Sequence, residues 1–499
     1  MSVGMFADNV PFLSIFIAMI AAFVTPVLPC GNRMAEKVTC AVMAVLTLLS
    51  ACLLFVLITE GRSFTYPMGA FPAPWGNELR AGPLEAMMAL TFCVIMLLSL
   101  VGNQSSTARD ISEERRPFFC ALIDLLMSSL LAMVYTNDIF TAYVFIEINT
   151  IAACAVVAAT QGREAVRAAL RYMVMSLVGS GFILLSICLL YGLTGHLLMQ
   201  NMHDAIQTLA QTGRYARPLA VSLNLIIIGL AVKSALYPFS AWLPDAHATA
   251  TDAASAILSG LVLKGYIFLI LKLCFRVFGP GVIHALHMDS ELLYLGLLAM
   301  IMGSVYAIRQ TNVKRMIAWS SVAQVGYIFL GIGLNTEAGA AAACFYIIVH
   351  AVVKPMLFTS VGGLIDVSGH KKELHDLRGS FYRNQWAGLG LIAGACSIMG
   401  IPLFAGFASK FVLTLASFES TAMIQALAVL VISTVLNALY YVPAVIVVMT
   451  PSPGAAMPPP RPRLLYRAAV ALFMTLTFFL GLFCVPVMHV LELGVRLFG

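Results

Sequence analysis

The stretch Lys233-Ser-Ala-Leu-Tyr-Pro-Phe-Ser-Ala-Trp-Leu-Pro-Asp-Ala-His247 places a lysine and a proline inside a long hydrophobic segment. Pro238 removes a backbone hydrogen bond about a turn and a half past Lys233. The stretch Gly400-Ile-Pro-Leu-Phe-Ala-Gly-Phe-Ala-Ser-Lys410 repeats this combination, with Pro402 ahead of the lysine. Interrupted helices at corresponding places in two halves of a chain are typical of inverted-repeat transporters with ion sites near the membrane midplane. The alternative is a pair of kinked helices whose lysines extend to the interface, but both breaks coincide with charge, which favours ion sites.

The composition indicates an integral membrane protein. Of the 499 residues, 61% are hydrophobic and 10% are charged. Apolar runs recur from about Pro11 to Val495, and a membrane-spanning helix needs only about 20 apolar residues. The first run follows Asp8 and has neither a basic segment before it nor a small-residue cleavage site after it. We therefore expect it to be the first span and not a removed signal peptide.

The expected fold class is an all-α integral membrane bundle that forms a single polytopic domain over residues 1–499. The apolar runs predict about 14 transmembrane helices, with helices seven and twelve broken. Their expected ranges are 11–29, 37–59, 86–102, 117–135, 138–160, 166–194, 217–241, 252–278, 290–309, 313–334, 338–364, 386–418, 423–449 and 467–495. The proline-rich stretch 451–463 is expected to be a linker, and the stretch from Glu60 to Glu85 an exterior loop.

Basic residues are distributed unevenly over the predicted loops. If the N-terminus faces outward, the exterior loops hold only Arg62, Arg80, Arg214 and Arg217. The loops on the other side hold Arg33, Lys37, Arg109, Arg115, Arg116, Arg163, Arg167, Arg309, Lys314, Arg315, Lys371, Lys372, Arg378, Arg383, Arg461 and Arg463. This asymmetry follows the positive-inside rule and predicts that both termini lie on the outer side. The net charge of +6 therefore reflects topology and does not indicate a nucleic-acid partner.

The sequence lacks the common motifs for redox or nucleotide chemistry. Its eleven cysteines are scattered singly, without a CxxC pair or a Cys/His cluster, so no iron–sulfur or zinc site is predicted. There is also no P-loop and no GxGxxG after a strand. We expect no cofactor or catalytic redox site in this chain, so electron transfer or ATP chemistry would have to occur in another subunit.

Five lysines interrupt the hydrophobic segments: Lys233, Lys264, Lys272, Lys354 and Lys410. A lysine at the centre of a spanning helix costs roughly 2.5–3.5 kcal/mol on insertion scales, so several of them together predict a path for charge. Lys272 lies near the exterior end of its helix, where we expect it to extend to the interface.

Five segments with charged residues follow one another along the chain: Asn137 to Glu147, Lys233 to His247, Ser255 to Lys264, His350 to Lys354 and Gly406 to Lys410. Taken together, they resemble the antiporter-like subunits. That family comprises the large membrane subunits of respiratory complex I, the Mrp-type sodium/proton antiporter subunits and the corresponding subunits of the membrane-bound energy-converting hydrogenases. The likeness covers roughly residues 117–415.

The resemblance implies a division of the chain into two inverted five-helix repeats. These would span residues 117–278 and 290–449. Residues 1–116 would then hold helices one to three, and residues 450–499 the linker and the C-terminal helix.

The resemblance also assigns roles to matching residues. Glu147 is similar to the carboxylate of helix five that pairs with the lysine of helix seven, here Lys233. Lys264 is similar to the central lysine of helix eight, and His350 to the histidine of helix eleven that joins the two half-channels. Lys410 resembles the terminal charge of helix twelve.

Other polar residues are auxiliary candidates. Asp245 and His247 match the loop after broken helix seven, whereas the following stretch lacks the prolines common in the family and carries Asp252 instead. Asp124 in helix four has no clear counterpart, and we consider a helix-cap partner and an auxiliary proton or sodium site equally. Lys354 lies four residues after His350 on one helical face and is expected to tune or share its proton.

The expected mechanism follows from the electrostatics of these groups. A buried carboxylate beside a buried ammonium favours both charged forms while desolvation disfavours each, so a small change in separation alters how readily the lysine gives up its proton. Separating Glu147 from Lys233 would loosen that proton, and Lys264, His350 and Lys410 would relay it through bridging waters. Moving one charge against 100 mV costs roughly 2.3 kcal/mol, which an external energy source must supply.

The leading hypothesis is a proton-translocating subunit of a multisubunit complex in a prokaryotic cytoplasmic (inner) membrane. It would be coupled either to redox chemistry in partners that hold iron–sulfur, nickel-iron, flavin or quinone groups, or to sodium/proton antiport. The residues from Asn137 to Glu147 and from Tyr191 to Gly195 resemble the Mrp and hydrogenase branches more closely than the quinone-reducing complexes. One alternative is a stand-alone secondary transporter for a small solute, and another is a structural membrane anchor.

Overall fold

In the computed structural model, which describes residues 7–27, 32–71, 76–420, 422–451 and 463–498, the chain folds almost entirely into helices. Twelve of the described helices are long and apolar enough to cross a membrane. Three shorter apolar helices, Val10–Val24, Gln385–Met399 and Ala405–Ser417, accompany them. The predicted multi-pass helical membrane protein is thereby confirmed.

The N-terminal part combines long helices with a small β-hairpin. Its elements are α2 (Val10–Val24), α3 (Asn32–Glu60), β1 (Phe64–Pro67), η1 (Met68–Ala70), β2 (Glu78–Ala81), α4 (Pro83–Asp110) and η2 (Glu113–Arg115). In the hairpin, β1 pairs antiparallel with β2, so that Phe64 lies opposite Ala81. The all-α prediction missed this hairpin because its strands are only four residues long and lie between prolines that indicated a loop.

The next part contains the helices of the first predicted repeat. Its elements are α5 (Arg116–Tyr135), α6 (Ile139–Ala158), α7 (Arg163–Thr194), α8 (Met199–Thr212), α9 (Ala216–Lys233), α10 (Trp242–Thr249), α11 (Asp252–Ile257), η3 (Leu258–Val262), α12 (Leu263–Lys272) and η4 (Leu273–Phe278). The amphipathic helix α8 was not predicted; its apolar side buries Met199, Met202 and Ile206.

The remaining elements complete the bundle. They are α13 (Pro280–Ala285), α14 (Met288–Ile308), α15 (Val313–Gly333), α16 (Glu337–Asp366), η5 (Leu374–Leu377), α17 (Ser380–Arg383), α18 (Gln385–Met399), α19 (Ala405–Ser417), α20 (Met423–Met449), α21 (Leu464–Leu482) and α22 (Cys484–Arg496). The single helix predicted over 467–495 is wrong, because α21 ends at Leu482 and α22 begins at Cys484. The linker predicted over 451–463 lies almost wholly outside the described residues.

Both predicted helix interruptions are present. The first separates α9 from α10 between Lys233 and Trp242, and the second separates α18 from α19 between Met399 and Ala405. Each interruption contains a non-glycine residue with positive φ, Ala235 at 55° and Leu403 at 77°. Such residues are uncommon and are held in place only by surrounding structure, which is frequent at functional sites.

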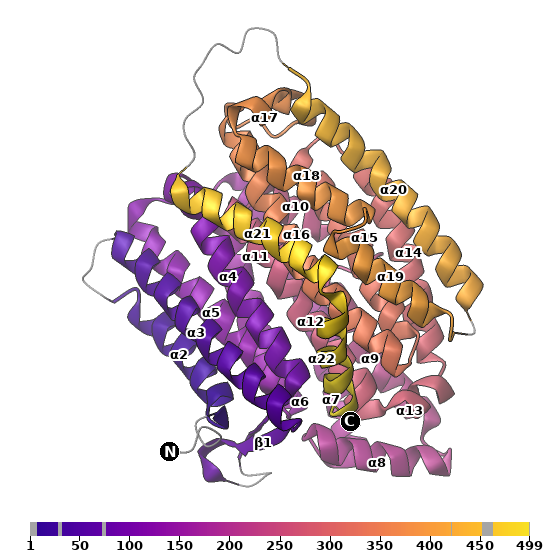
Figure 1. Ribbon diagram of the computed structural model, residues 1–499. Helices are drawn as coiled ribbons and strands as arrows, with labels where there is room; N and C mark the ends of the chain where they lie inside the picture. The colour runs from indigo at the N-terminus through magenta and orange to yellow at the C-terminus, as the bar shows by residue number, and fades with distance from the viewer. Residues whose placement is uncertain (1–6, 28–31, 72–75, 421, 452–462, 499) are drawn as a thin grey trace.

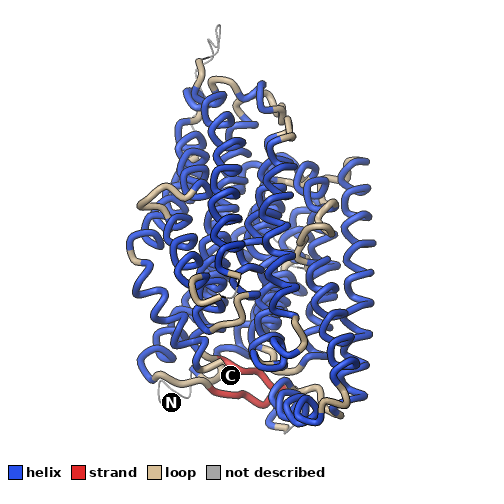
Figure 2. Tube along the Cα trace, turned by 90° about the vertical axis from the view of Figure 1, so that its right-hand side faces the viewer, coloured by secondary structure: helices blue, strands red, loops and turns tan. Residues whose placement is uncertain are grey.

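The helices are arranged so that the predicted site lies at the centre of the bundle. The apolar centres of the continuous helix from Asp252 to Phe278 and of helix α16 are fully buried, and that of α15 is nearly so. The two termini lie at the same end, near β1 and α8, whereas α17 lies at the opposite end (Figure 1). Helix α21 lies obliquely across α4, α16, α18 and α19. Figure 2 shows most helices running in a common direction, with the hairpin across one end of the bundle.

Candidate functional site

The first buried charge pair joins α6 to the end of α9. Glu147 Oε1 lies 3.4 Å from Lys233 Nζ, so the expected ion pair forms. The lysine side chain is fully buried, whereas that of Glu147 is 23% exposed. Ser180 of α7 donates a hydrogen bond to Glu147. Lys233 Nζ also donates to Thr150 Oγ1 at 2.8 Å, so this ammonium has two oxygen partners on α6.

Polar side chains missed by the sequence analysis extend this pair into the bundle. Thr150 Oγ1 and Tyr266 Oη are 3.2 Å apart, and the Tyr266 ring lies 5.7 Å from Lys233 Nζ. Tyr266 also donates to Asn149 Oδ1 at 3.1 Å, and Asn149 Nδ2 donates to Ser129 Oγ at 2.8 Å. There was little reason in the sequence to select these residues, because single hydroxyl and amide groups are common in apolar helices. Only the position of Thr150, three residues after Glu147, pointed to the site.

The break after Lys233 is held by two aromatic residues. The indole of Trp242 donates to Val232 O at 3.2 Å, in addition to the backbone bond that this carbonyl accepts from Ala235 N at 3.3 Å. The Trp242 ring stacks on Tyr172 of α7 with centroids 4.2 Å apart. Stacked aromatic pairs contribute about 0.5–1.5 kcal/mol beyond area burial, so these contacts fix the end of α9 and with it the lysine.

Lys264 follows an irregular turn at the centre of the bundle. The stretch Leu258–Val262 is a π-helical turn, a wider form of helix that is frequent at functional sites. Lys264 Nζ donates to Ser259 O, and Ser259 Oγ lies 3.0 Å from Ser321 Oγ of α15. A Cβ atom on Gly260 would lie 2.3 Å from Pro355 Cγ, so only glycine permits this approach to α16.

Two histidines lie beside this centre with unused nitrogens. His247 and His350 are buried, and within the described chain neither ring makes a hydrogen bond. The His247 ring stacks on Phe358 with centroids 4.5 Å apart. Because a buried imidazole without a partner is costly, these nitrogens mark places where water can be held.

Lys354 turns toward α15 and not toward His350. Its Nζ donates to Ile317 O at 3.0 Å and to Ser320 Oγ at 2.7 Å. Ser320 Oγ in turn lies 3.1 Å from Tyr441 Oη of α20. No hydrogen bond joins Lys354 to His350 among the described residues, because the lysine ammonium is directed to Ile317 O and Ser320 Oγ of α15.

Lys410 connects the two half-helices of the second interruption. Its Nζ donates to Ile398 O at 2.8 Å in the last turn of α18, and to Thr434 Oγ1 of α20 at 3.3 Å. A cation near the C-terminal end of a helix is favourable because the helix dipole is negative there. The ammonium also lies 5.3 Å from the centroid of the Tyr327 ring, which is within range of a cation–π contact.

A second polar network surrounds Lys410. Tyr327 donates to Ser433 Oγ at 2.9 Å and accepts from Asn437 Nδ2 at 3.3 Å. Tyr440 donates to Asn437 Oδ1 at 2.5 Å. These residues, like Thr150 and Tyr266 in the first half, were not predicted, because a buried Asn or Tyr in an apolar helix is usually a packing residue.

The remaining candidates lie toward the α17 end of the bundle. Asp252, the first residue of α11, pairs with Lys314 at 2.6 Å, and both are buried. A surface pocket of about 440 Å³ reaches this pair. Lys372 also lines this pocket and donates to Ala248 O at 2.7 Å. Burial lowers the pKa of the Lys372 ammonium from its ordinary value, and the nearby Lys314 lowers it further.

Asp245 has a different setting from the other candidates. Its carboxylate pairs with Arg171 at 2.7 Å and with Arg315 at 2.5 Å, and both arginines are exposed. The three residues tie α7, α10 and α15 together at the surface, so Asp245 lies apart from the buried lysines.

The prediction that Lys272 extends to the membrane interface is wrong. Its side chain is fully buried, and its Nζ donates to Val134 O at 2.5 Å and to Thr136 O at 2.8 Å. The ammonium therefore caps the C-terminal end of α5 and does not extend to the interface. Beside it lies a buried pair that was not predicted, Arg276 of η4 and Glu85 of α4, with nitrogen and oxygen 3.9 Å apart.

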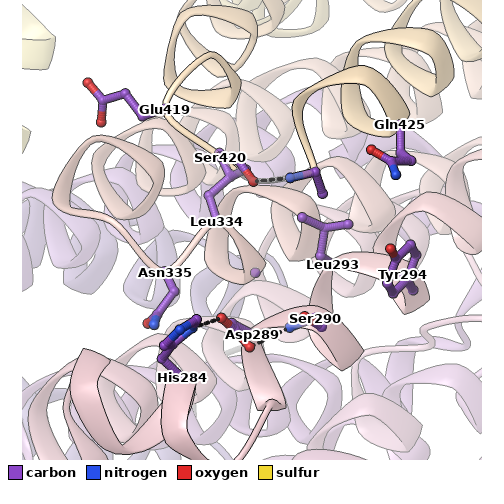
Figure 3. A pocket seen from close by; sticks show the side chains of 12 residues that line it. His284, Asp289, Ser290, Leu293, Tyr294, Leu334, Asn335, Glu419, Ser420 and Gln425 are labelled. Atoms are coloured by element: carbon purple, nitrogen blue, oxygen red, sulfur yellow. Dashed lines mark hydrogen bonds and ion pairs between the residues drawn. The ribbon is translucent and has the colours of Figure 1, made fainter.

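Figure 3 shows a separate pocket of about 310 Å³ at the surface. It contains the ion pair between His284 Nδ1 and Asp289 Oδ2, which are 2.7 Å apart. None of the residues predicted for the relay lines this pocket.

The surroundings of the buried lysines differ from those of a conventional metal site. Three or more His, Cys, Asp or Glu residues do not gather anywhere in the described ranges, so no conventional metal site is found there. In the same ranges, Lys264, Lys354 and Lys410 hydrogen-bond to neutral oxygens and form no ion pair with a carboxylate.

A family model described as "NADH:quinone oxidoreductase/Mrp antiporter, TM" matches residues 136–437. The chain belongs to this family. Within it, NADH-quinone oxidoreductase subunit N of Desulforudis audaxviator (strain MP104C) is 32% identical over 411 residues, covering 81% of this chain and 79% of that protein. The D subunit of the Na(+)/H(+) antiporter of Bacillus subtilis (strain 168) is 27% identical over 480 residues, covering 95% and 94%.

Two solved structures share the fold. A chain of the membrane-bound sulfane sulfur reductase, an archaeal respiratory membrane complex, matches with a TM-score of 0.87 and 28% identity, over 98% of this chain and 97% of that one. A chain of the Mrp complex from Dietzia sp. DQ12-45-1b matches with a TM-score of 0.86, over 99% of this chain and 97% of that one. Its sequence identity is 21%, so the likeness is one of fold. The matched family region includes every relay candidate from Glu147 to Lys410, whereas Asp124 lies before it.

Proposed function

We propose that this chain translocates protons as a subunit of a multisubunit membrane complex. The observation that carries the proposal is a series of buried lysines at both helix interruptions and in the fully buried helices between them. A buried ammonium without a counter-ion costs several kcal/mol, and release of its proton removes that cost. Such groups are therefore suited to taking up and passing on protons.

The Glu147 and Lys233 pair is the proposed switch. Lys233 has Thr150 as an alternative oxygen at 2.8 Å, nearer than the carboxylate at 3.4 Å. A small movement at the break after α9 would exchange the charged partner for the neutral one, and the lysine would then release its proton more readily. The break is a suitable place for this movement because Ala235 already has a positive φ.

The central residues would carry the proton from the first half to the second. Lys264 is directed to Ser259 O, and Lys354 to Ser320 on the far side of the centre. In the proposed order of proton transfer, His350 comes between Lys264 and Lys354. Its ring nitrogens have no hydrogen-bond partner among the described residues. Water molecules would bridge these groups, because ordered waters make hydrogen bonds nearly as favourable as direct ones.

Asp252 is the proposed entry on the α17 side. The surface pocket of about 440 Å³ is lined by both Asp252 and Lys314, and His247 of α10 lies five residues before Asp252 in the chain. A proton accepted at this pair would pass toward His247 and Lys264. Lys410 would then end the route in the second half, where Asn437 and Tyr327 surround it.

The proposed function also implies how the chain crosses the membrane. We infer 14 crossings, counting α9 with α10, α18 with α19 and α21 with α22 as one crossing each. The repeats would span 117–278 and 290–449, after helices one to three in 1–116 and before the C-terminal part 450–499. Both termini would lie on the outer side of a prokaryotic inner membrane, because the basic loops gather on the other side.

Another membrane subunit would cover the face of α6 that carries Glu147. Val144 and Ile151, one turn before and after it, are 40% and 63% exposed. A partly exposed carboxylate in a spanning segment is unfavourable against lipid, and a neighbouring helix with a polar group would shield it. The names of the relatives support such partners, which would hold any iron–sulfur, nickel-iron, flavin or quinone group and the driving reaction.

Co-purification tests the proposal directly. The tagged chain is extracted gently from its native host, and the proteins bound to it are identified by mass spectrometry. We expect other membrane subunits, with redox subunits indicating a redox-driven pump and small Mrp-like subunits a sodium/proton antiporter. Recovery of the chain alone as a stable species would contradict the proposal and favour a stand-alone solute transporter.

A further inference from the structure

Asp124 is a buried carboxylate remote from the predicted relay sequence. It lies on α5 and is 0% exposed. Its Oδ2 accepts hydrogen bonds from Thr39 of α3 at 3.0 Å and from Thr25 at 3.4 Å. Its Oδ1 is buried and makes no hydrogen bond within the described part of the chain, and no lysine, arginine or histidine described there forms an ion pair with it.

The end of α2 adds negative character at the same place. Thr25 is the C-cap residue of α2, and its hydroxyl contacts the carboxylate. The last carbonyls of a helix lack partners within the helix, and this end of the helix dipole is negative. A carboxylate and a helix C-terminus therefore face each other in a buried position, which a cation between them would stabilise.

We propose that Asp124, Thr25 and Thr39 form a sodium-binding site. All their side-chain donors are oxygens, the type that hard cations prefer. Two hydroxyl groups already donate to Oδ2, which stabilises the ionised carboxylate. A protonated carboxyl would instead need an acceptor for its own hydrogen, and none is available to Oδ1 among the described residues.

Glu36 is a second carboxylate on the same helix as Thr39. It lies on α3 one turn before Thr39 and is partly exposed, and its Oε1 is buried without a partner among the described residues. Gln104 of α4 donates to the other oxygen, Oε2, at 3.0 Å. Glu36 would attract the cation by its negative charge, and Asp124 would bind it.

This inference deepens the proposed function by naming sodium as a second ion, and it rests on that function only in treating the chain as an ion-handling subunit. Sodium binding is measured without turnover, so it can fail while proton transport stands. Conversely, proton transport can fail while sodium binding stands.

The test is equilibrium binding of ²²Na⁺ to the purified complex at constant ionic strength, with choline chloride as the balancing salt. We expect the wild-type complex to retain one more sodium ion per copy of this chain than Asp124→Asn. Thr39→Val should weaken the binding about tenfold or more, because loss of an outer-shell partner already costs about tenfold in metal affinity and Thr39 is itself a proposed ligand. Excess KCl should compete poorly.

Ser128→Ala is the matched control. Ser128 lies one turn after Asp124 on α5 and donates to Ile15 O of α2 at 3.0 Å, so it belongs to the same helix interface but not to the site. This variant should bind sodium like the wild type. Equal sodium binding by wild type and Asp124→Asn would overturn the proposal, and so would a loss in Ser128→Ala as large as that in Thr39→Val. If Asp124→Asn does not assemble, Thr39→Val compared with Ser128→Ala decides the question.

Discussion

Replacing Glu147 with glutamine removes the only charged partner of Lys233 among the described residues and preserves the shape of the side chain. At 3.4 Å and an effective dielectric constant of about 20, the attraction between the two charges is about 5 kcal/mol. Breaking a buried ion pair typically costs about 3–5 kcal/mol, and the partial exposure of Glu147 argues for the lower figure. If only about 1.4 kcal/mol of this enters the transport barrier, the rate falls tenfold.

The assay is proton uptake by inverted membrane vesicles that contain the complex, followed with a pH-sensitive dye and normalised to the amount of assembled complex. Glu147→Gln should reduce uptake at least about tenfold, and Glu147→Asp should retain part of it. Asp245→Asn is the matched control, because it makes the same carboxylate-to-amide change in a surface ion pair and should leave uptake unchanged. Normal uptake by assembled Glu147→Gln would refute the proposed switch.

The other predictions concern the centre of the bundle. Lys264→Met should abolish proton uptake in an assembled complex, and full activity would show that the route bypasses this lysine. The same change two turns later, Lys272→Met, should instead lower the melting temperature by leaving buried carbonyls unsatisfied, at about 1–3 kcal/mol each; an unchanged melting temperature would contradict its capping role. Gly260→Val should impair assembly or proton uptake, because its side chain would meet Pro355, and Gly260→Ala should do so less; normal assembly and uptake of Gly260→Val would contradict the close packing.

The sequence predicted where the buried lysines lie better than it predicted which groups they contact. The interruptions near Lys233 and Lys410 were predictable, because proline and glycine in an apolar run weaken the helix at the same place where a lysine adds a charge. The direction of Lys354 was not predictable, because its position on α16 fits either His350 or the oxygens of Ile317 and Ser320 on α15. Helical spacing alone does not distinguish these two.

Tertiary packing accounts for the remaining differences. Lys272 was expected at the interface because it lies near a helix end, but the end of α5 supplies carbonyls that hold it inside. Thr150 and Tyr266 become part of the site only because α6, α9 and α12 meet there. The split between α21 and α22 was not predictable from hydropathy, because Phe483 between them is as apolar as its neighbours.

The most direct test of the central claim is the number of protons moved per turnover by the complex reconstituted in proteoliposomes, with the driving reaction measured in the same sample. Wild type is compared with a variant that carries both Glu147→Gln and Lys264→Met. If protons move through this chain, the variant should move fewer protons per turnover while the driving reaction continues. An unchanged number of protons per turnover would contradict the account.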